Sequence, residues 1–258
     1  MPKPVAIVRP PSSSMGDCLL THKQRESIDS DLAQRQHRAY REALVAIGCE
    51  VVEIDPANDC PDSVFVEDPV VVVNELGVIA RPATDSRRAE RPSMERALKP
   101  FRELAHIEAP ATIEGGDVIR IGKILYVGRG TRTNDEGVAQ LRSHIGPLGY
   151  TVIPVPVTGC LHLKTGACWI GGNRVLVNSD WLDVSAFEGR EIIEVSPDEP
   201  WSANGVLIGK KIVVPAGAAK TSAMLRSFGL EVHEVALSEM QKAEGSATCL
   251  SVLLNDQD

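Results

Sequence analysis

The feature that most constrains the fold is an internal repeat. Three segments share one layout: GGDVIRIGKILYVG (115–128), GACWIGGNRVLVN (166–178) and NGVLIGKKIVVP (204–215). Each has an apolar run, a turn that contains Gly122, Gly172 or Gly209, and a second apolar run. Because glycine readily adopts the positive φ that tight turns need, the three segments predict β-hairpins.

A helix and a further strand tend to follow each hairpin. After the first hairpin, residues 133–149 predict a helix that begins with a capping box (Thr133 and Glu136) and ends at Gly149. Other stretches fit the same β-β-α-β plan: a hairpin at 65–82, helices at 93–104 and 221–229, and strands at 105–110, 150–157 and 230–237. The units begin near positions 65, 114, 162, 204 and 249.

The last unit is split between the two ends of the chain. After the strand at 249–254 the chain stops, and the missing parts are found at the N-terminus as a strand at 4–9, a helix at about 29–47 and a strand at 49–55. The C-terminal strand is therefore predicted to pair beside the N-terminal strand and to close a ring of repeats. We expect one α/β domain that comprises residues 1–258. The alternative is an ordinary open α/β sheet.

Composition and charge limit the classes of partner. The net charge of −8 argues against nucleic acid and anionic membranes, and it is compatible with a small cationic substrate. The six cysteines have no CxxC or framework spacing, which favours free thiols and a cytoplasmic location. No apolar run approaches the roughly 20 residues that span a bilayer.

The residues that open the units carry chemistry. If equivalent strands point to a common axis, their first residues meet there: Phe65, Glu67, Asp68, Glu114, His162, Asn204 and Cys249. Singly, each has an ordinary explanation as a buried thiol, a core histidine or a solvated carboxylate. Their coincidence at one pole of a repeat indicates an active site.

This set of side chains suits a narrow chemistry. Cys249 becomes a nucleophile once it is ionised, and His162 can move protons near neutral pH. Carboxylates beside a thiolate would repel an oxyanion, which makes acyl transfer a poor fit. They would instead hold a cation by charge-assisted hydrogen bonds, and a guanidinium is planar, cationic and electrophilic at carbon.

A metal site is a weaker interpretation. Cys160 and His162 would share one face of a strand, but no third ligand of clear spacing accompanies them. A zinc ion held by Cys249 and His162 would block the nucleophile. We therefore expect neither a metal nor a cofactor.

Several motifs resemble those of one family. They are FVEDP, RPATDSRR, IEGGD, GTRTNDEG, HLKTG and TCLSVLLN, and they occur in family order over essentially the whole chain. The family is that of the dimethylarginine dimethylaminohydrolases, in the guanidine-modifying (pentein) superfamily. The resemblance implies a five-bladed ββαβ propeller that hydrolyses Nω-methylated L-arginine to L-citrulline and an alkylamine, and it suggests a homodimer.

The resemblance also implies roles in the reaction. By motif position, Cys249 is similar to the family's nucleophile and His162 to its general acid and base. Glu114 would bind the guanidinium and orient His162, while Asp68, with Glu67 beside it, would grip the other guanidine nitrogens.

Further positions resemble those that hold the rest of the substrate. Arg87 and Arg132 match the pair that receives the carboxylate; the alternatives are that Arg88 replaces Arg87 and that Arg132 only supports a helix start. Phe65 would pack on the apolar stem of the substrate. The family's lid corresponds to about residues 12–20, where Leu19 is the expected substrate contact.

Other functions remain open. The nearest is a hydrolase or deiminase of another guanidino or ureido compound, such as free arginine or citrulline. Arginine deiminases usually have an inserted helical module and tend to carry Arg at the position of Glu67, which this chain does not. A non-catalytic binding propeller would lack the set of Cys249, His162 and carboxylates.

Overall fold

The computed structural model of the chain describes residues 3–255. Its strands are β1 (Val5–Val8), β2 (Glu50–Glu53), β3 (Val70–Val72), β4 (Leu76–Ile79), β5 (Glu103–His106), β6 (Val118–Ile121), β7 (Ile124–Arg129), β8 (Thr151–Pro156), β9 (Ala167–Trp169), β10 (Arg174–Val177), β11 (Glu191–Glu194), β12 (Val206–Ile208), β13 (Lys211–Pro215), β14 (Glu231–Val235) and β15 (Val252–Leu254). Its α-helices are α1 (Ser30–Ala46), α2 (Asp85–Arg88), α3 (Arg91–Leu98), α4 (Asp135–Ile145), α5 (Leu163–Gly166), α6 (Ala219–Ser227) and α7 (Ser238–Lys242). Short 3₁₀ helices are η1 (Met15–Asp17), η2 (Gly115–Asp117), η3 (Gly146–Leu148), η4 (Val184–Phe187) and η5 (Thr248–Leu250).

The strands form five sheets of three strands each, and all five follow one pattern. The orders are β3-β4-β5, β6-β7-β8, β9-β10-β11, β12-β13-β14 and β15-β1-β2. In every sheet the middle strand is antiparallel to the first strand and parallel to the third. The structure thus has the repeat that the hairpins predicted.

The two ends of the chain complete the fifth sheet. β15 pairs with β1, with Val5 opposite Leu254 and Ile7 opposite Val252. The prediction that the C-terminal strand lies beside the N-terminal strand is confirmed. Cys249 is therefore followed at once by a strand that is held on a sheet, although it lies close to the C-terminus.

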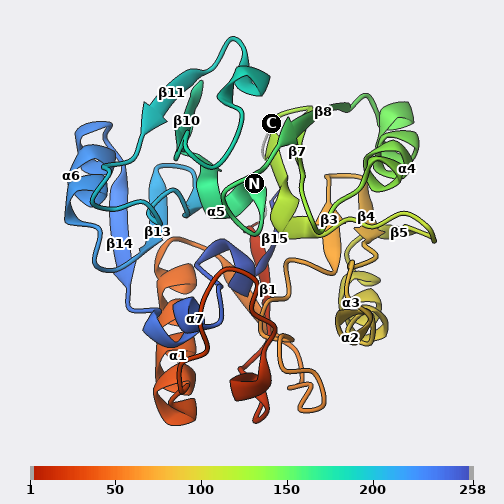
Figure 1. Cartoon of the computed structure of the whole chain (residues 1–258), viewed down its shortest axis with the longest axis horizontal. Coiled ribbons are helices and arrows are strands. Elements are labelled where there is room, and N and C mark those ends of the chain that lie inside the picture. Colours follow the sequence, from red (N-terminus) through yellow and green to blue (C-terminus); the bar gives the residue numbers. More distant parts are fainter. Residues whose placement is uncertain (1–2, 256–258) are drawn as a thin grey trace.

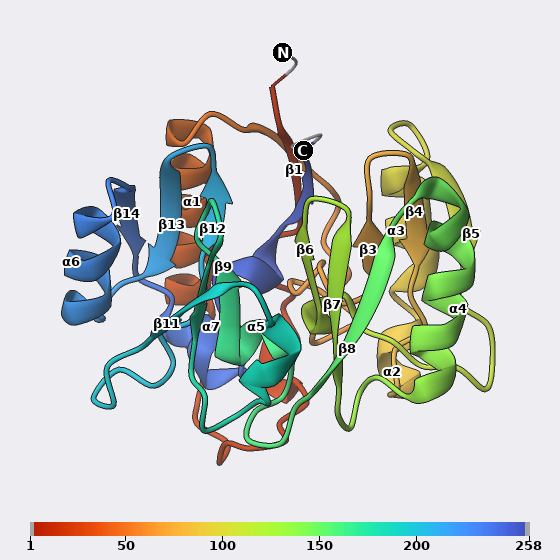
Figure 2. The same cartoon turned by 90° about the horizontal axis from the view of Figure 1, so that it is seen from above.

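Local sequence explains most of the elements. Gly122, Gly172 and Gly209 turn the three hairpins with φ values of 59°, 56° and 60°, in the region that disfavours residues with a Cβ atom. The carboxylate of Asp29 accepts the amide hydrogen of Leu32 and caps α1. In Figure 1 the helices α1, α3, α4 and α6 lie at the periphery, and the sheets surround the middle of the molecule; the second view agrees (Figure 2).

Some helix predictions were wrong in detail. Asn134, and not Thr133, caps α4, because the Asn134 side chain accepts the amide hydrogen of Gly137 while the Thr133 hydroxyl donates to Asp117. The helix expected at 93–104 is α3, which begins at Arg91 and ends at Leu98, two residues before Pro100, which has no amide hydrogen to continue the helical hydrogen bonds. In the β9–β11 unit, η4 takes the place of an α-helix.

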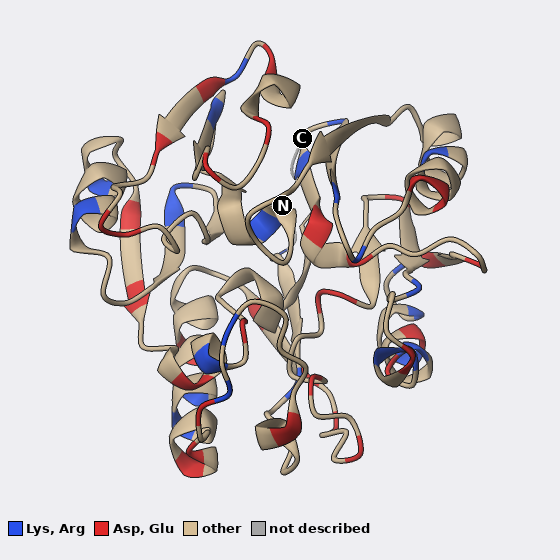
Figure 3. Cartoon of the chain, viewed as in Figure 1, with Lys and Arg blue, Asp and Glu red and all other residues tan. Residues whose placement is uncertain are grey.

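A cavity of about 220 Å³ opens among the first strands of the five sheets. Residues of β3, β6, β9, β12 and β15 all line it. Lys and Arg are interspersed with Asp and Glu over the elements (Figure 3). Within residues 3–255, no helix has the length and apolar character required to cross a membrane.

Candidate active site

A small pocket of about 20 Å³ collects seven of the predicted site residues. They are Leu19, Phe65, Asp68, Arg87, Arg132, His162 and Cys249, and the pocket is also lined by Asp62, Leu161, Ala243, Glu244 and Gly245. Three of them lie in the segments that lead into the first strands of their sheets: Asp68 and Cys249 stand just before β3 and β15, and His162 precedes α5, which leads directly into β9. Of the seven residues expected to meet at one pole, Phe65, Asp68, His162 and Cys249 thus line one pocket, while Glu67, Glu114 and Asn204 do not line it.

His162 is held between carboxylates. Its Nε2 lies 2.7 Å from Oε2 of Glu114, and its Nδ1 lies 3.9 Å from Oδ1 of Asp68. Burial by itself lowers the pKa of His162, but the negative charges of Asp68, Asp117 and Glu114 outweigh it and raise the pKa to about 9. Imidazolium is therefore the stable form at neutral pH, as a general acid requires.

Glu114 is the completely buried partner of this histidine. Burial raises its pKa, but the hydrogen bond and charge of His162, together with Arg87 and Arg132, bring the pKa down to about 2. Glu114 is the residue immediately before η2, and this position directs its carboxylate to His162. The first two residues of η2, Gly115 and Gly116, have no room for a Cβ atom. A Cβ on Gly116 would lie 2.8 Å from Nδ1 of His162, so glycine allows the imidazole to approach.

Cys249 is a half-buried thiol in η5. Burial, and then the charges of Asp68 and Glu67, raise its pKa to about 12. Its backbone is fixed by neighbours: its amide donates to the carbonyl of Ser246 at 3.2 Å, and the amide of Glu67 donates to its carbonyl at 3.3 Å. The nucleophile is thus well placed but protonated.

Arg87 differs from its predicted role as a free carboxylate receptor. It is 4% exposed, and its guanidinium forms ion pairs with Asp68 and Glu90. One of its nitrogens also donates to the carbonyl of Phe65 at 3.0 Å. Arg87 lines the pocket, but in this structure its guanidinium orients Asp68.

Arg132 faces the pocket with fewer partners. One of its nitrogens donates to the hydroxyl of Thr21 at 3.1 Å, and another lies 3.5 Å from Oε1 of Glu114. These contacts can be exchanged for those of a bound carboxylate more readily than the ion pairs of Arg87. The alternative that Arg88 acts here has no support, because Arg88 pairs with the exposed Asp85 and does not line the pocket.

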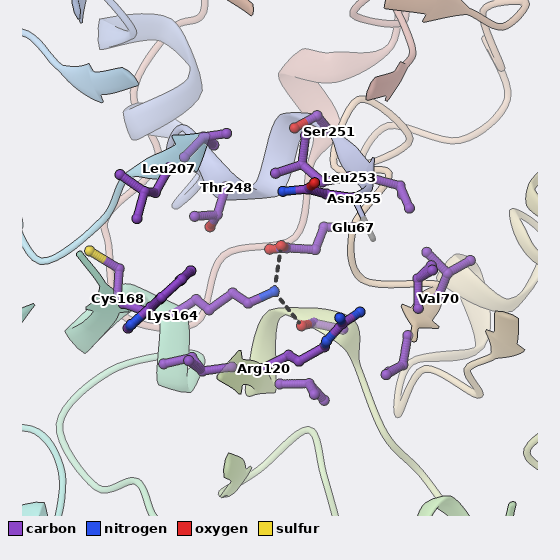
Figure 4. Close-up of a pocket in the computed structure, with 18 of the residues that line it drawn as sticks. Glu67, Val70, Arg120, Lys164, Cys168, Leu207, Thr248, Ser251, Leu253 and Asn255 are labelled. Carbon is purple, nitrogen blue, oxygen red and sulfur yellow. Dashed lines mark hydrogen bonds and ion pairs between the residues drawn. The ribbon is translucent and has the colours of Figure 1, made fainter. Parts of the chain in front are cut away.

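Glu67 lies outside the small pocket, although it was predicted to join Asp68 there. Its Oε1 is 2.6 Å from Nζ of Lys164, and this pair lies in the cavity among the five sheets (Figure 4). Burial outweighs the attraction of Lys164 and raises the pKa of Glu67 to about 7. Its second oxygen is buried and has no hydrogen-bond partner among residues 3–255, so it remains able to accept from a donor.

Three residues that shape the site, Asp62, Asp117 and Glu244, were not predicted from the sequence, and a fourth, Asn204, was expected at the common axis without a stated role. Asp62 accepts the amide hydrogen of Leu19, with one oxygen at 3.1 Å. Asp117 accepts from the hydroxyl of Thr133 at 2.6 Å and from the amide of Leu163, the residue after His162, at 3.0 Å. Asn204 exchanges two hydrogen bonds with Thr248, and Glu244 contacts the segment around Thr21. Asp117, directly after the GG of IEGGD, had a positional signal, as did Asn204 at the start of its unit; Asp62 and Glu244 had none.

One cluster also has the geometry of a metal site. Asp68, Glu114 and His162 each offer a ligand atom, and these atoms lie within 4.8 Å of one another. Arg87 already neutralises Asp68, and the Glu114 carboxylate pairs with His162. Cys160 does not join this cluster, because its thiol donates to the backbone carbonyl of His162 at 3.2 Å.

The chemistry that the pocket can perform follows from its charges. It combines an acidic wall, a protonated imidazole and a thiol beside them. A planar cation would be attracted to Asp68 and Glu114, and its positive charge would favour the thiolate of Cys249. The arrangement suits nucleophilic attack on a cationic, amidine-like carbon.

Comparisons with known proteins agree with this chemistry. The family model described as N,N dimethylarginine dimethylhydrolase, eukaryotic, matches residues 11–205. The chain is 42% identical over 257 residues to an N(G),N(G)-dimethylarginine dimethylaminohydrolase of Streptomyces coelicolor, covering 99% of both chains. It is 34% identical to the enzyme of the same name from Pseudomonas aeruginosa, covering 95% of this chain and 97% of the relative.

Solved structures give the same result. A Pseudomonas aeruginosa dimethylarginine dimethylaminohydrolase mutant in complex with citrulline superposes with a TM-score of 0.92 at 33% identity, covering 96% of this chain and 98% of that one. The N-terminal domain of ArgZ, a cyanobacterial arginine dihydrolase, superposes with a TM-score of 0.89 at 20% identity and shows the shared fold alone. The chain belongs to the dimethylarginine dimethylaminohydrolase family.

Proposed function

We propose that the protein hydrolyses Nω-methylated L-arginine to L-citrulline and an alkylamine through a covalent intermediate at Cys249. The observation that carries the proposal is the single pocket that holds a thiol, a protonated histidine and buried carboxylates. The similarity to relatives that bear this activity in their names, one of them bound to citrulline, supports it. No cofactor takes part in the proposed reaction.

Substrate binding comes first in the mechanism. The guanidinium lies against Asp68 and Glu114, while Phe65 and Leu19 contact the aliphatic stem. Arg132 receives the substrate carboxylate in exchange for its contact with Thr21, and Arg87 remains a predicted second receptor that would have to exchange a partner. Glu67, with its unpartnered oxygen, is proposed to support the same cation from behind.

Attack by Cys249, loss of the amine and hydrolysis then follow in order. The cation lowers the pKa of Cys249, the thiol proton is released to solvent, and the sulfur bonds to the guanidine carbon. The bond from that carbon to the alkylated nitrogen breaks as His162 donates its proton to the departing amine. Neutral His162 then takes a proton from water, and the resulting hydroxide adds to the same carbon. The carbon–sulfur bond breaks, the sulfur leaves with the bonding electrons, and the hydroxyl proton of the adduct passes to that thiolate, which releases citrulline and restores the Cys249 thiol.

At the level of the fold, we propose a single catalytic domain built as a five-bladed propeller. The shared pattern of the five sheets and the pairing of β1 with β15 support a closed ring around the central cavity. A homodimer and a cytoplasmic location stay predictions; the mass of the purified protein in solution tests the former.

The decisive experiment is a substrate panel. Purified protein is incubated with asymmetric dimethylarginine, monomethylarginine, arginine and citrulline, and the ureido product and the released amine are measured. We expect citrulline and alkylamine from the methylated arginines. Ammonia from arginine or citrulline alone would assign the rival deiminase or ureidohydrolase activity, and no product from any compound would favour a binding protein.

A further inference from the structure

The segment that covers the active-site pocket is attached to one carboxylate. The backbone amides of three consecutive residues, Thr21, His22 and Lys23, donate to Glu244 at 2.9, 2.5 and 2.6 Å. These residues directly follow Leu19 and Leu20, and both Leu19 and Glu244 line the pocket. Hydrogen bonds to an ionised acceptor are about twice as strong as neutral ones, so this is the strongest visible attachment of the segment.

The backbone of Glu244 is itself unusual. Its φ is +60°, and among residues 3–255 it is the one non-glycine residue with a positive φ. The left-handed region is unfavourable for a residue with a Cβ atom, and such conformations gather at functional sites. The next residue, Gly245, is pressed against Phe65, because a Cβ there would lie 2.1 Å from a ring carbon. The Glu244 carboxylate is thus held on a fixed base, five residues before Cys249.

The same segment has weaker contacts on either side. Nζ of Lys23 donates to the carbonyl of Gln241 at 2.7 Å and lies 5.3 Å from the centre of the Trp201 ring. Arg132 donates to the hydroxyl of Thr21, so the residue proposed to take the substrate carboxylate also contacts the covering segment. A bound carboxylate would compete with that contact.

The size of the pocket shows that the segment has to move. A volume of about 20 Å³ is little more than the roughly 10–15 Å³ that a single water molecule needs. An amino acid with a guanidine side chain does not fit this pocket while Leu19 and the three amides stay in place. A neighbouring pocket of about 150 Å³, which Cys249 also lines, is bordered by Lys23 and Glu244 as well. Opening requires that the hydrogen bonds to Glu244 break.

We infer that Glu244 is a positioning residue that holds residues 19–23 closed over Cys249, and that access to the thiol is controlled by the release of these three amides. Glu244 touches neither the reacting atoms nor the proton path. It acts through the segment, by setting how often the pocket is open and how firmly Leu19 and Thr21 are held when it is shut.

Four variants distinguish the effect of the Glu244 carboxylate from the effect of its backbone conformation. Glu244→Ala and Glu244→Gly both remove the acceptor, but only glycine also relieves the positive φ. Glu244→Gln keeps a neutral acceptor. Glu26→Gln is the matched control, because Glu26 is an exposed carboxylate in the same stretch of chain with no role in the pocket.

The first measurements do not depend on the identity of the substrate, so they remain decisive even if the proposed function fails. They are the rate of Cys249 alkylation by iodoacetamide and the hydrogen exchange of the peptide that contains residues 21–23. We expect Glu244→Ala and Glu244→Gly to raise both rates roughly tenfold, equivalent to the loss of about 1.4 kcal/mol of closed-state stability. Glu244→Gln should lie between them and the parent, and Glu26→Gln should match the parent.

Turnover of methylated arginine then gives a second readout. Because the closed segment contributes to the bound ground state and the transition state alike, its loss should raise KM while kcat changes little. Unchanged alkylation and exchange in both Glu244→Ala and Glu244→Gly would overturn the inference. So would acceleration in Glu244→Ala alone, since that would assign the effect to backbone strain.

Discussion

At the scale of single residues, negative charge dominates the surroundings of Cys249. Asp68 and Glu67 act on the thiol after burial has already disfavoured its ionised form. Cys249 therefore stays a thiol at neutral pH in the absence of substrate. A cationic substrate changes this balance at the moment of attack, which ties activation of the nucleophile to occupancy of the pocket.

This balance predicts the pH dependence of Cys249. With its pKa raised to about 12, the substrate-free thiol should react with iodoacetamide about tenfold faster for each pH unit between 7 and 10, because the thiolate fraction rises in that proportion. A plateau near neutral pH would contradict the raised pKa. Cys249→Ser should be nearly inactive and identifies the labelled residue.

The two arginines of the pocket should respond differently to substitution. Arg132→Ala should lose selectivity for amino-acid guanidines over plain alkylguanidines, because it removes a receptor for the carboxylate while the Asp68–Arg87 pair remains. Arg87→Ala should instead destabilise the protein by about 3–5 kcal/mol, because Asp68 and Glu90 are left buried without their partner. Urea unfolding and kcat/KM on paired substrates measure the two effects. Equal stability losses would contradict this division.

At the scale of elements, α4 shows how tertiary contacts choose among caps. The capping-box pattern of Thr133 and Glu136 predicted that Thr133 caps this helix. In the structure the Thr133 hydroxyl donates to buried Asp117, and Asn134 accepts from Gly137 and also from Thr112. The requirement to satisfy a buried carboxylate outweighed the local pattern.

The cap gives a stability prediction. Asn134→Ala should lower the free energy of unfolding by about 1–2 kcal/mol, because both amides lose their acceptor. Glu136→Ala is the control, since Glu136 is exposed and the observed cap does not use it; it should stay within about 0.5 kcal/mol. A larger loss for Glu136→Ala would restore the capping box. Urea unfolding checks both variants.

At the scale of the whole molecule, the active site depends on the junction of the two chain ends. Tyr40 of α1 donates to the carbonyl of Ala247 at 2.7 Å and lies 2.8 Å from the hydroxyl of Ser251, on either side of Cys249. β15 then pairs with β1. The N-terminal part of the chain thus holds the nucleophile in position.

That dependence predicts a coupled loss. Ile7 is fully buried in β1 and belongs to the same apolar cluster as Val70 and Val252. Ile7→Ala should destabilise the protein by about 2–5 kcal/mol through loss of burial and creation of a cavity. It should also make the rate of Cys249 alkylation by iodoacetamide less uniform, because the nucleophile is held less firmly. Val45→Ala is the control, because that side chain is 58% exposed; a comparable loss there would contradict the argument.

The sequence by itself determined the elements and the kinds of side chain that meet. Hairpin glycines, the Asp29 cap of α1 and the split fifth unit are local or periodic signals, because backbone sterics and strand or helix periods act over a few residues. From these followed the pairing of β1 with β15 and the gathering of Asp68, His162 and Cys249.

Only the tertiary structure decided which charges pair and how deeply they are buried. Arg87 bonds to Asp68, Glu67 turns to Lys164, and Glu244 reaches amides more than 200 residues away in sequence. No periodic pattern records such contacts, because they arise when distant segments pack and each buried charge must find a partner. The pKa values that prepare His162 and Cys249 follow from that packing, so they could not be obtained from the sequence alone.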